Sequence, residues 1–116
     1  MGMNVVTLVG RMCADPERKT TANGVVNCPF RLAVQRRFAN ANGERESDFI
    51  NCKAWRGTAE FVAKYARKGD QIAVSGSLAT GTWTDADGVK HVTFEVNADA
   101  VELLTRHGAD GAGELG

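Results

Sequence analysis

The chain has 116 residues, the size of a single domain, and it is long enough to bury a core without disulfides or metals. Hydrophobic residues make up 43% of it and charged residues 24%, as in ordinary soluble globular proteins. Fourteen basic and fourteen acidic residues give a formal net charge of zero. This balance excludes a globally basic nucleic-acid binder of the histone type, but it does not exclude a locally basic one.

The charges are distributed unevenly along the chain. Residues 31–68 contain nine basic and four acidic side chains, whereas residues 85–116 contain two basic and seven acidic ones. The middle third can therefore face an anion, although ordinary solvated charge explains the same count.

The three cysteines are Cys13, Cys28 and Cys52, an odd number without a C-x-x-C motif, so neither a disulfide framework nor a zinc module is indicated. Free thiols fit a reducing cytosol, and we expect a cytoplasmic protein. The first residues lack the long apolar run of a signal peptide or a membrane span.

Alternation of apolar residues with period two is the dominant pattern, and it predicts strands. The first expected strand, residues 3–11, carries valine and leucine on both faces, as central strands and strands at subunit interfaces do. Asn23-Gly24 predicts a tight turn before the second strand, residues 25–38. The third strand is expected at residues 48–55, after a polar loop.

Residues 58–68 change to a helical period, with an apolar stripe through Phe61 and Tyr65. Thr58 is the expected N-cap of this helix, and Gly69 is expected to follow its last turn. We predict no other helix.

Two further strands are expected at residues 71–83 and 89–104, joined by a hairpin turn at residues 85–88. Their alternation predicts that the buried side chains are Ile72, Val74, Leu78, Val92, Phe94, Val96 and Ala98. Phe30 and Phe61 are also assigned to the core. Residues 105–116 are rich in glycine and lack periodicity, so we expect a flexible tail after a folded domain at residues 1–104.

Five strands with one helix between the third and the fourth are the layout of an OB-fold. The predicted fold class is therefore all-β, a five-stranded OB-fold barrel. Such barrels bind oligonucleotides or oligosaccharides on a strand face and its loops. The fold alone does not decide between these ligands.

Four aromatic side chains are predicted to lie off the core: Phe38, Phe49, Trp55 and Trp83. Phe49 and Trp55 alternate with the core residues of the third strand and share their face with Lys53. Exposed rings stack on nucleobases without reading sequence, and basic neighbours neutralise phosphates. Because a duplex hides the faces of its bases, the pattern favours a single strand.

The basic residues beside these rings are candidate phosphate contacts: Arg36, Arg37, Lys53, Arg56, Arg67 and Lys68. Any one of them can instead be a solvated charge, and the rings can instead pack under a loop or against another subunit. Sugar-binding clefts also use exposed rings, but they usually combine them with carboxylates and amides rather than with arginine and lysine.

An enzyme is poorly supported by this sequence. The only histidines are His91 and His107, and His91 has no cysteine or carboxylate at motif spacing, so we interpret it as a strand-face histidine. His107 falls in the expected tail. No catalytic residue, metal or cofactor is implied.

Several runs of residues carry a more specific signal. They are Asn4-Val5-Val6-Thr7-Leu8-Val9-Gly10-Arg11, Asp15-Pro16-Glu17, Phe30-Arg31-Leu32-Ala33-Val34, Asp48-Phe49-Ile50-Asn51-Cys52, Ala54-Trp55-Arg56, Tyr65-Ala66-Arg67-Lys68-Gly69-Asp70, Gly76-Ser77-Leu78 and Trp83-Thr84-Asp85-Ala86-Asp87-Gly88. In this order they resemble the bacterial single-stranded DNA-binding proteins, an OB-fold family, over about residues 3–104.

The resemblance implies a protein that coats single-stranded DNA during replication, recombination or repair. In the family, rings aligned with Phe38, Phe49, Trp55 and Trp83 stack on bases, and a basic residue aligned with Lys68 contacts the DNA backbone. The resemblance also implies a homotetramer built from two dimers, with the first strand joining protomers. The alternative is a protein-interaction module of a primosome-like assembly, and ring stacking does not distinguish DNA from RNA.

The sequence also departs from the family pattern. Phenylalanine stands at two stacking positions where tryptophan is frequent, and Gly81 and Thr82 stand where basic residues often precede the last ring. Family members usually end in an acidic tip that recruits replication and repair proteins. This sequence ends at Glu114-Leu115-Gly116, so it is either truncated or a short form, and recruitment through a tip is not expected.

Overall fold

Strands dominate the computed structural model, which describes residues 2–105. In chain order the elements are β1 (Val6–Met12), β2 (Lys19–Thr20), β3 (Val26–Gln35), β4 (Ser47–Trp55), α1 (Arg56–Tyr65), β5 (Gln71–Thr84) and β6 (Lys90–Leu103). The five predicted strands and the single predicted helix are all present, and the sequence missed only the two-residue strand β2. Residues 106–116 of the expected flexible tail lie outside the described residues.

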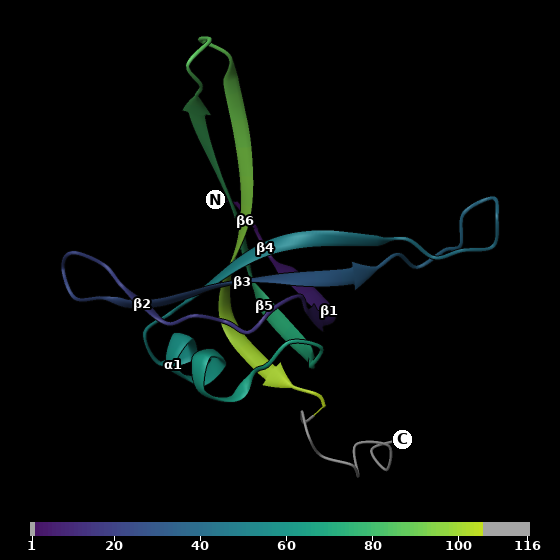
Figure 1. The fold of residues 1–116 in the computed structure, drawn as a ribbon, viewed down its shortest axis with the longest axis horizontal. Coiled ribbons are helices and arrows are strands. Elements are labelled where there is room, and N and C mark those ends of the chain that lie inside the picture. Colours follow the sequence, from purple (N-terminus) through teal and green to yellow (C-terminus); the bar gives the residue numbers. More distant parts are fainter. Residues whose placement is uncertain (1, 106–116) are drawn as a thin grey trace.

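The strand pairings form a closed circuit that begins and ends at β1. β1 pairs with β5, β5 with β6, β6 with β4, β4 with β3, and β3 again with β1 (Figure 1). Among the strands of residues 2–105, only β4 and β6 pair in parallel, and β2 adds to the free edge of β3. Five strands therefore close a barrel, and α1, which packs against β3, β4 and β6, follows the third of them, as an OB-fold requires.

The core fills the barrel with the side chains that alternate inward. Its largest fully buried members are Leu32, Ile72, Val62, Val74, Val96, Cys28 and Cys52. Phe30 is buried and Phe61 packs against this core, as predicted. Burial raises the pKa of the Cys28 thiol, and it raises that of Cys52 to about 12. Both thiols are therefore protonated and act as small apolar side chains.

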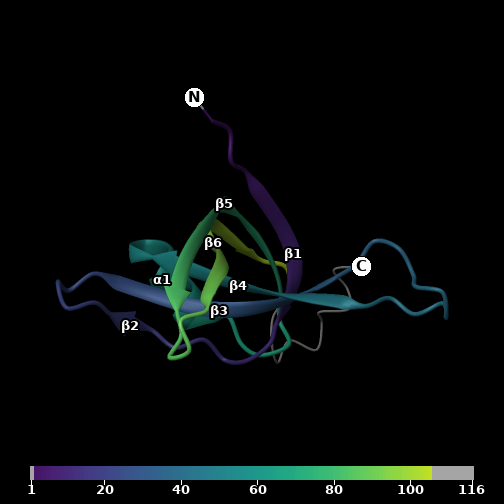
Figure 2. The same cartoon turned by 90° about the horizontal axis from the view of Figure 1, so that it is seen from above.

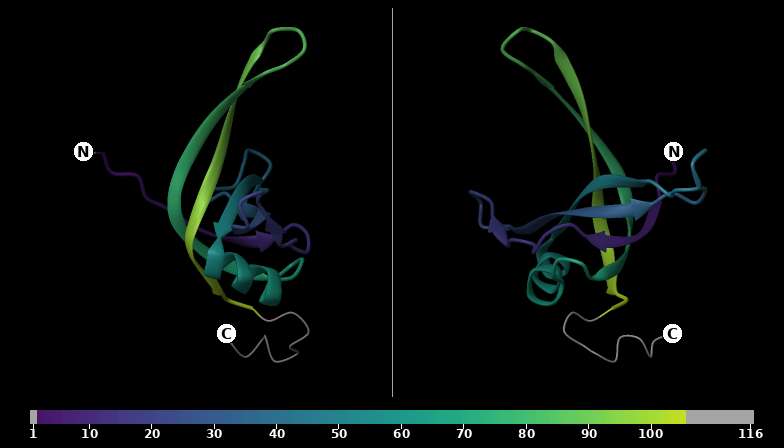
Figure 3. Two further views of the ribbon diagram at one scale, coloured as in Figure 1. Left: turned by 90° about the vertical axis from the view of Figure 1, so that its left-hand side faces the viewer. Right: turned by 45° about the vertical axis from the view of Figure 1, so that its right-hand side comes forward.

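The prediction that Leu78, Val92 and Phe94 are buried is wrong. Their exposed fractions are 40%, 57% and 59%. The reason is the length of the β5–β6 hairpin, whose pairing continues as far as Thr84 and Lys90 and whose tip projects beyond the barrel (Figure 3). Alternation continues along the hairpin, but there is no core beneath it.

The predicted ends of the helix are also wrong. α1 begins at Arg56, and its N-cap is Trp55, whose side chain makes no capping hydrogen bond. The expected cap, Thr58, instead donates through Oγ1 to the carbonyl of Asp99 at 3.4 Å. The helix begins two residues before the predicted start, because β4 runs directly into it, and it ends at Tyr65, three residues before the predicted end. Gly69, with φ of 90°, lies in the turn that follows.

In the part of the chain that the structure describes, no helix is both long and apolar enough to cross a membrane.

Candidate nucleic-acid interface

The outward face of β4 carries a row of predicted site residues. Phe49, Lys53 and Trp55 lie there because they alternate with the buried Cys52 and Ala54. Phe49 and Trp55 are six residues apart, which corresponds to roughly 20 Å along a strand. A row of this length can contact several nucleotides of an extended chain.

A cation lies over each of the two rings on β4. Arg31 Cζ is 5.1 Å from the centroid of Phe49, and Lys53 Nζ is 5.4 Å from that of Trp55. The two aromatic residues are 58% and 37% exposed. Cation–π attraction keeps each positive charge beside its ring. A base can therefore stack on the ring while a neighbouring phosphate contacts the cation.

Arg31 was not among the predicted phosphate contacts. The β3–β4 register pairs it with Asn51, on the face that also carries Phe49. The signal in the sequence was its position opposite to the core residues Phe30 and Leu32, but its contact with Phe49 depends on the strand register.

Phe38 lies in the loop that connects β3 to β4 and projects from the body of the barrel (Figure 1). Its side chain is 76% exposed, and Arg37 Cζ lies 5.5 Å from its ring. A third predicted ring is therefore accompanied by a guanidinium group.

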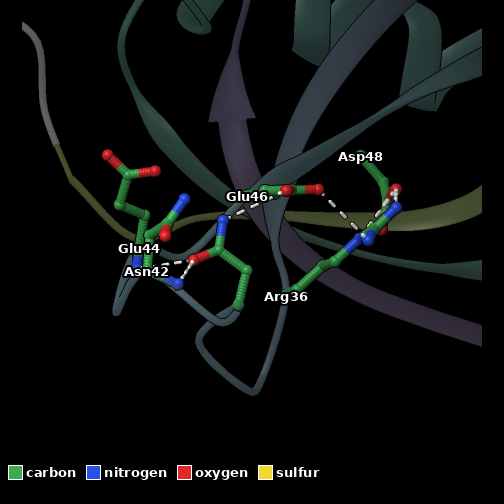
Figure 4. A network of polar contacts seen from close by, with 6 residues as sticks. Arg36, Asn42, Glu44, Glu46 and Asp48 are labelled. Carbon is green, nitrogen blue, oxygen red and sulfur yellow. Dashed lines mark hydrogen bonds and ion pairs between the residues drawn. The ribbon is translucent and has the colours of Figure 1, made fainter.

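Arg36, at the base of the same loop, forms ion pairs with the carboxylates of Glu46 and Asp48 (Figure 4). Its Nη2 donates to Asp48 Oδ1 at 2.9 Å, its Nε donates to Asp48 Oδ2 at 3.2 Å, and its Nη1 donates to Glu46 Oε1 at 3.3 Å. The hydrogen bond from Arg36 holds the pKa of Asp48 below its ordinary value. The charge of Arg36 is thus already balanced within the protein.

Asn40 completes this network in the loop. Its Nδ2 donates to Glu46 Oε2 at 3.2 Å, and its Oδ1 accepts the backbone N–H groups of Asn42 and Glu44 at 2.9 and 3.0 Å. The side chain of Asn40 therefore ties the turn of the loop to the carboxylate that contacts Arg36.

Trp83 lies in β5 near the tip of the long hairpin and is 53% exposed. Its ring stacks on His91, its cross-strand neighbour, with 4.4 Å between centroids and 18° between planes. His91 Nε2 lies 2.8 Å from Asp85 Oδ2. The interpretation of His91 as an isolated strand-face residue missed this carboxylate, which the hairpin turn brings beside it.

The remaining predicted basic residues lie at the two ends of α1. Arg56 is exposed next to Trp55 and has a left-handed backbone conformation, with φ of 54°. Arg67 Nη1 donates to the carbonyls of Ala63 and Ala66 at 3.1 and 2.7 Å, so this side chain caps the helix end. Lys68 is exposed. The structure therefore gives Arg67 a role within the fold.

The surface beside Phe49 is hollowed. An open depression of about 600 Å³ is lined in part by Arg31, Asn51, Phe94 and Glu95. A second depression, of about 410 Å³, shares the last three of these residues and also touches Phe49. Among residues 2–105, no group of three or more histidine, cysteine or acidic side chains is placed to hold a metal ion.

Residues 3–104 match the family model described as the single-strand binding protein family. The chain belongs to this family. It is 49% identical over 102 residues to a "Single-stranded DNA-binding protein" of Bacillus cereus, covering 88% of this chain and 60% of that protein. It is 47% identical over 102 residues to "Single-stranded DNA-binding protein 2" of Listeria monocytogenes, covering 88% and 64%. It is 43% identical over 114 residues to "Single-stranded DNA-binding protein A" of Bacillus subtilis, covering 98% and 66%.

The chain spans about 60% of the length of the first of these relatives. The matched region contains all four predicted rings and all six predicted basic residues, as well as Arg31 and His91. In this member of the single-strand binding protein family, the four predicted rings lie on three separate parts of the surface: β4, the β3–β4 loop and the β5–β6 hairpin.

Proposed function

We propose that this chain binds and coats single-stranded DNA without strong sequence preference, by stacking bases on Phe38, Phe49, Trp55 and Trp83. The observation that carries the proposal is the pairing of rings with charges, since three of the four predicted rings have a guanidinium or ammonium group within 5.5 Å. Stacking contributes about 1–3 kcal/mol per base on such rings. The relatives, which are named single-stranded DNA-binding proteins, support the same ligand.

Basic side chains that are exposed, or in the case of Lys53 partly exposed, are the proposed phosphate contacts. They are Arg31, Arg37, Lys53, Arg56 and Lys68. Arg36 and Arg67 already have partners within the protein, and we assign them supporting roles, in the β3–β4 loop and at the end of α1 respectively.

The proposed role in the cell is to protect single-stranded DNA in the cytoplasm during replication, recombination or repair. It requires binding and no chemical step, and we therefore propose a protein without enzymatic activity. The comparisons support the DNA-binding part of this role through the names of the relatives.

We further propose a homotetramer made of two dimers. In the described residues, β1 pairs with β3 only at Arg11 and Met12, so residues 6–10 keep one edge without a neighbouring strand. Val5 and Val9 are 71% and 46% exposed. The Asn4 side chain is hydrogen-bonded to the backbone of Leu78 in β5, and the N-terminal end of the chain leads away from the barrel (Figure 2). An open strand edge with apolar neighbours pairs readily with a second copy of the same strand.

The exposed apolar side chains of the hairpin offer a second surface for assembly. Leu78, Val92 and Phe94 lie along one side of it, where a monomer leaves them in water. Large apolar patches of this kind are typical of protein interfaces. Light scattering is expected to give a mass close to four chains.

A competition experiment tests the proposed ligand. A fluorescein-labelled dT oligomer bound by the protein should be displaced by an unlabelled single strand but not by a duplex of equal length, because the duplex hides its base faces. If the labelled oligomer does not bind at low salt, the exposed rings belong to a protein interface, as in the alternative of an interaction module. An RNA oligomer in the same assay measures the preference for DNA.

A further inference from the structure

The tip of the β5–β6 hairpin contains an ordered stack of three side chains. Asp85, in the turn, accepts the backbone N–H groups of Asp87 and Val89 through Oδ1, each at 2.9 Å. Its other oxygen, Oδ2, lies 2.8 Å from His91 Nε2. The imidazole of His91 in turn lies flat against the indole of Trp83.

The ionisation of Asp85 fixes the direction of the middle hydrogen bond. Hydrogen bonds from His91 and from the backbone of Val89 hold the pKa of Asp85 below its ordinary value, so the side chain is a carboxylate at neutral pH. A carboxylate only accepts hydrogen bonds, and His91 Nε2 must therefore carry the hydrogen. Backbone N–H groups of the turn fix the Asp85 carboxylate, and this carboxylate fixes the orientation of the His91 imidazole.

One face of the Trp83 ring is occupied by this imidazole, and the side chain as a whole is still 53% exposed. The hairpin here lies beyond the barrel (Figure 3), and Trp83 is not among the residues that form the core or pack against it. Without His91, Trp83 would move among several rotamers and would have to be ordered each time it stacked on a base. With His91, the ring is already held flat, and its opposite face is the one open to a ligand.

We propose that His91, held by Asp85, is a positioning residue that backs the Trp83 ring and keeps it ready to stack on a nucleobase. The inference rests on the proposed function for its ligand, but the arrangement of the ring in the free protein does not depend on it. Pre-ordering one rotamer-rich side chain removes part of the entropy cost of binding, which corresponds to about a two- to tenfold gain in affinity.

The first test needs no DNA. In a Trp55→Phe background, Trp83 is the only tryptophan of the chain, and its time-resolved fluorescence anisotropy reports the motion of its ring. We expect His91→Ala to enlarge the fast nanosecond component, and His91→Phe, which restores a flat ring, to reduce it again. An unchanged decay in His91→Ala overturns the inference.

The second test measures binding of a dT oligomer by four variants: His91→Ala, His91→Phe, Trp83→Ala and the double alanine variant. We expect His91→Ala to weaken binding about two- to tenfold, His91→Phe to restore it, and His91→Ala to have no further effect once Trp83 is absent. Additive losses, full affinity in His91→Ala, or failure of His91→Phe to restore binding overturn the inference.

The two proposals fail in different ways. If the unmodified chain does not bind dT, the proposed function fails. If it binds and loses affinity in Trp83→Ala, but His91→Ala binds as tightly as the unmodified chain, only the role of His91 fails. Because both residues lie on the hairpin outside the barrel, thermal unfolding of each variant should follow that of the unmodified chain, and this is measured alongside.

Discussion

Arg36 and Asp48 form a bidentate ion pair at the base of the β3–β4 loop, with Nη2 and Nε donating to the two carboxylate oxygens at 2.9 and 3.2 Å. Both side chains are about half exposed, so water screens the pair and its contribution to stability is small. Its larger effect is on charge, because Glu46 also contacts Arg36 and the guanidinium faces two carboxylates. A phosphate at this position would have to displace them.

This arrangement makes a prediction about salt dependence. Each phosphate contact with a single strand adds about 0.7 to the slope of log Kd against log salt concentration. Arg37→Gln is expected to lower the slope by about that amount, since Arg37 makes no ion pair among the described residues. Arg36→Gln is expected to leave the slope nearly unchanged, and an equal loss in both variants would show that Arg36 contacts phosphate.

The same pair predicts how the protein responds to acid. The pKa of Asp48 lies below its ordinary value of 3.8 because Arg36 donates to the ionised form. A lowered pKa in the folded state stabilises the fold fully above about pH 4, and this contribution is lost as the pH falls through the folded-state value. NMR titration of the Asp48 carboxyl should therefore show its pKa rising in Arg36→Gln. A pKa that does not move in this variant would show that Arg36 does not cause the shift.

The Trp55 side chain is expected to contribute to the affinity for single-stranded DNA rather than to the stability of the fold. Trp55→Ala should weaken dT binding by about 1–3 kcal/mol and leave thermal unfolding nearly unchanged, because the ring is partly exposed and makes no capping hydrogen bond. Tyr65→Ala is the matched control, since Tyr65 is 46% exposed and has Lys64 Nζ at 5.3 Å, but lies on α1 rather than on β4. An equal loss of affinity in both variants would mean that the effect is not specific to the face of β4.

Much of the barrel could be predicted from alternation alone. Phe30, Leu32 and Cys52 alternate inward, and Phe49 and Trp55 alternate outward, as expected. Alternation along a strand predicts which face of the sheet a side chain occupies. It does not predict whether other residues pack over that face. Leu78, Val92 and Phe94 were therefore assigned to a core that ends before the hairpin does.

The details of the candidate site depended on contacts between residues distant in sequence. The sequence shows the charge of Arg36 but not its partners, because Asp48 becomes its neighbour only through the antiparallel register of β3 and β4. His91 gains its carboxylate in the same way, through the hairpin turn at Asp85. Thr58 is a suitable N-cap in isolation, but the continuation of β4 into α1 starts the helix earlier.

Gly76 is expected to be required for the fold. It lies at the register shift between β5 and β6, and a Cβ atom there would overlap the carbonyl oxygen of Asn97. Gly76→Ala should lower the free energy of unfolding, measured with urea, by about 3 kcal/mol. In contrast, Gly57→Ala in α1 meets no atom within 4 Å and should raise it by about 0.4–1 kcal/mol. Equal effects of the two substitutions would contradict the packing described at Gly76.

Titration of the intrinsic tryptophan fluorescence with poly-dT at several salt concentrations tests the central claim most directly. Trp55 and Trp83 are the only tryptophans, and both are proposed to stack on bases. The expected result is quenching on addition of poly-dT, with an affinity that falls linearly on a logarithmic salt scale. Absence of quenching at low salt would contradict the account, because two exposed rings that stack on bases cannot remain spectroscopically unchanged.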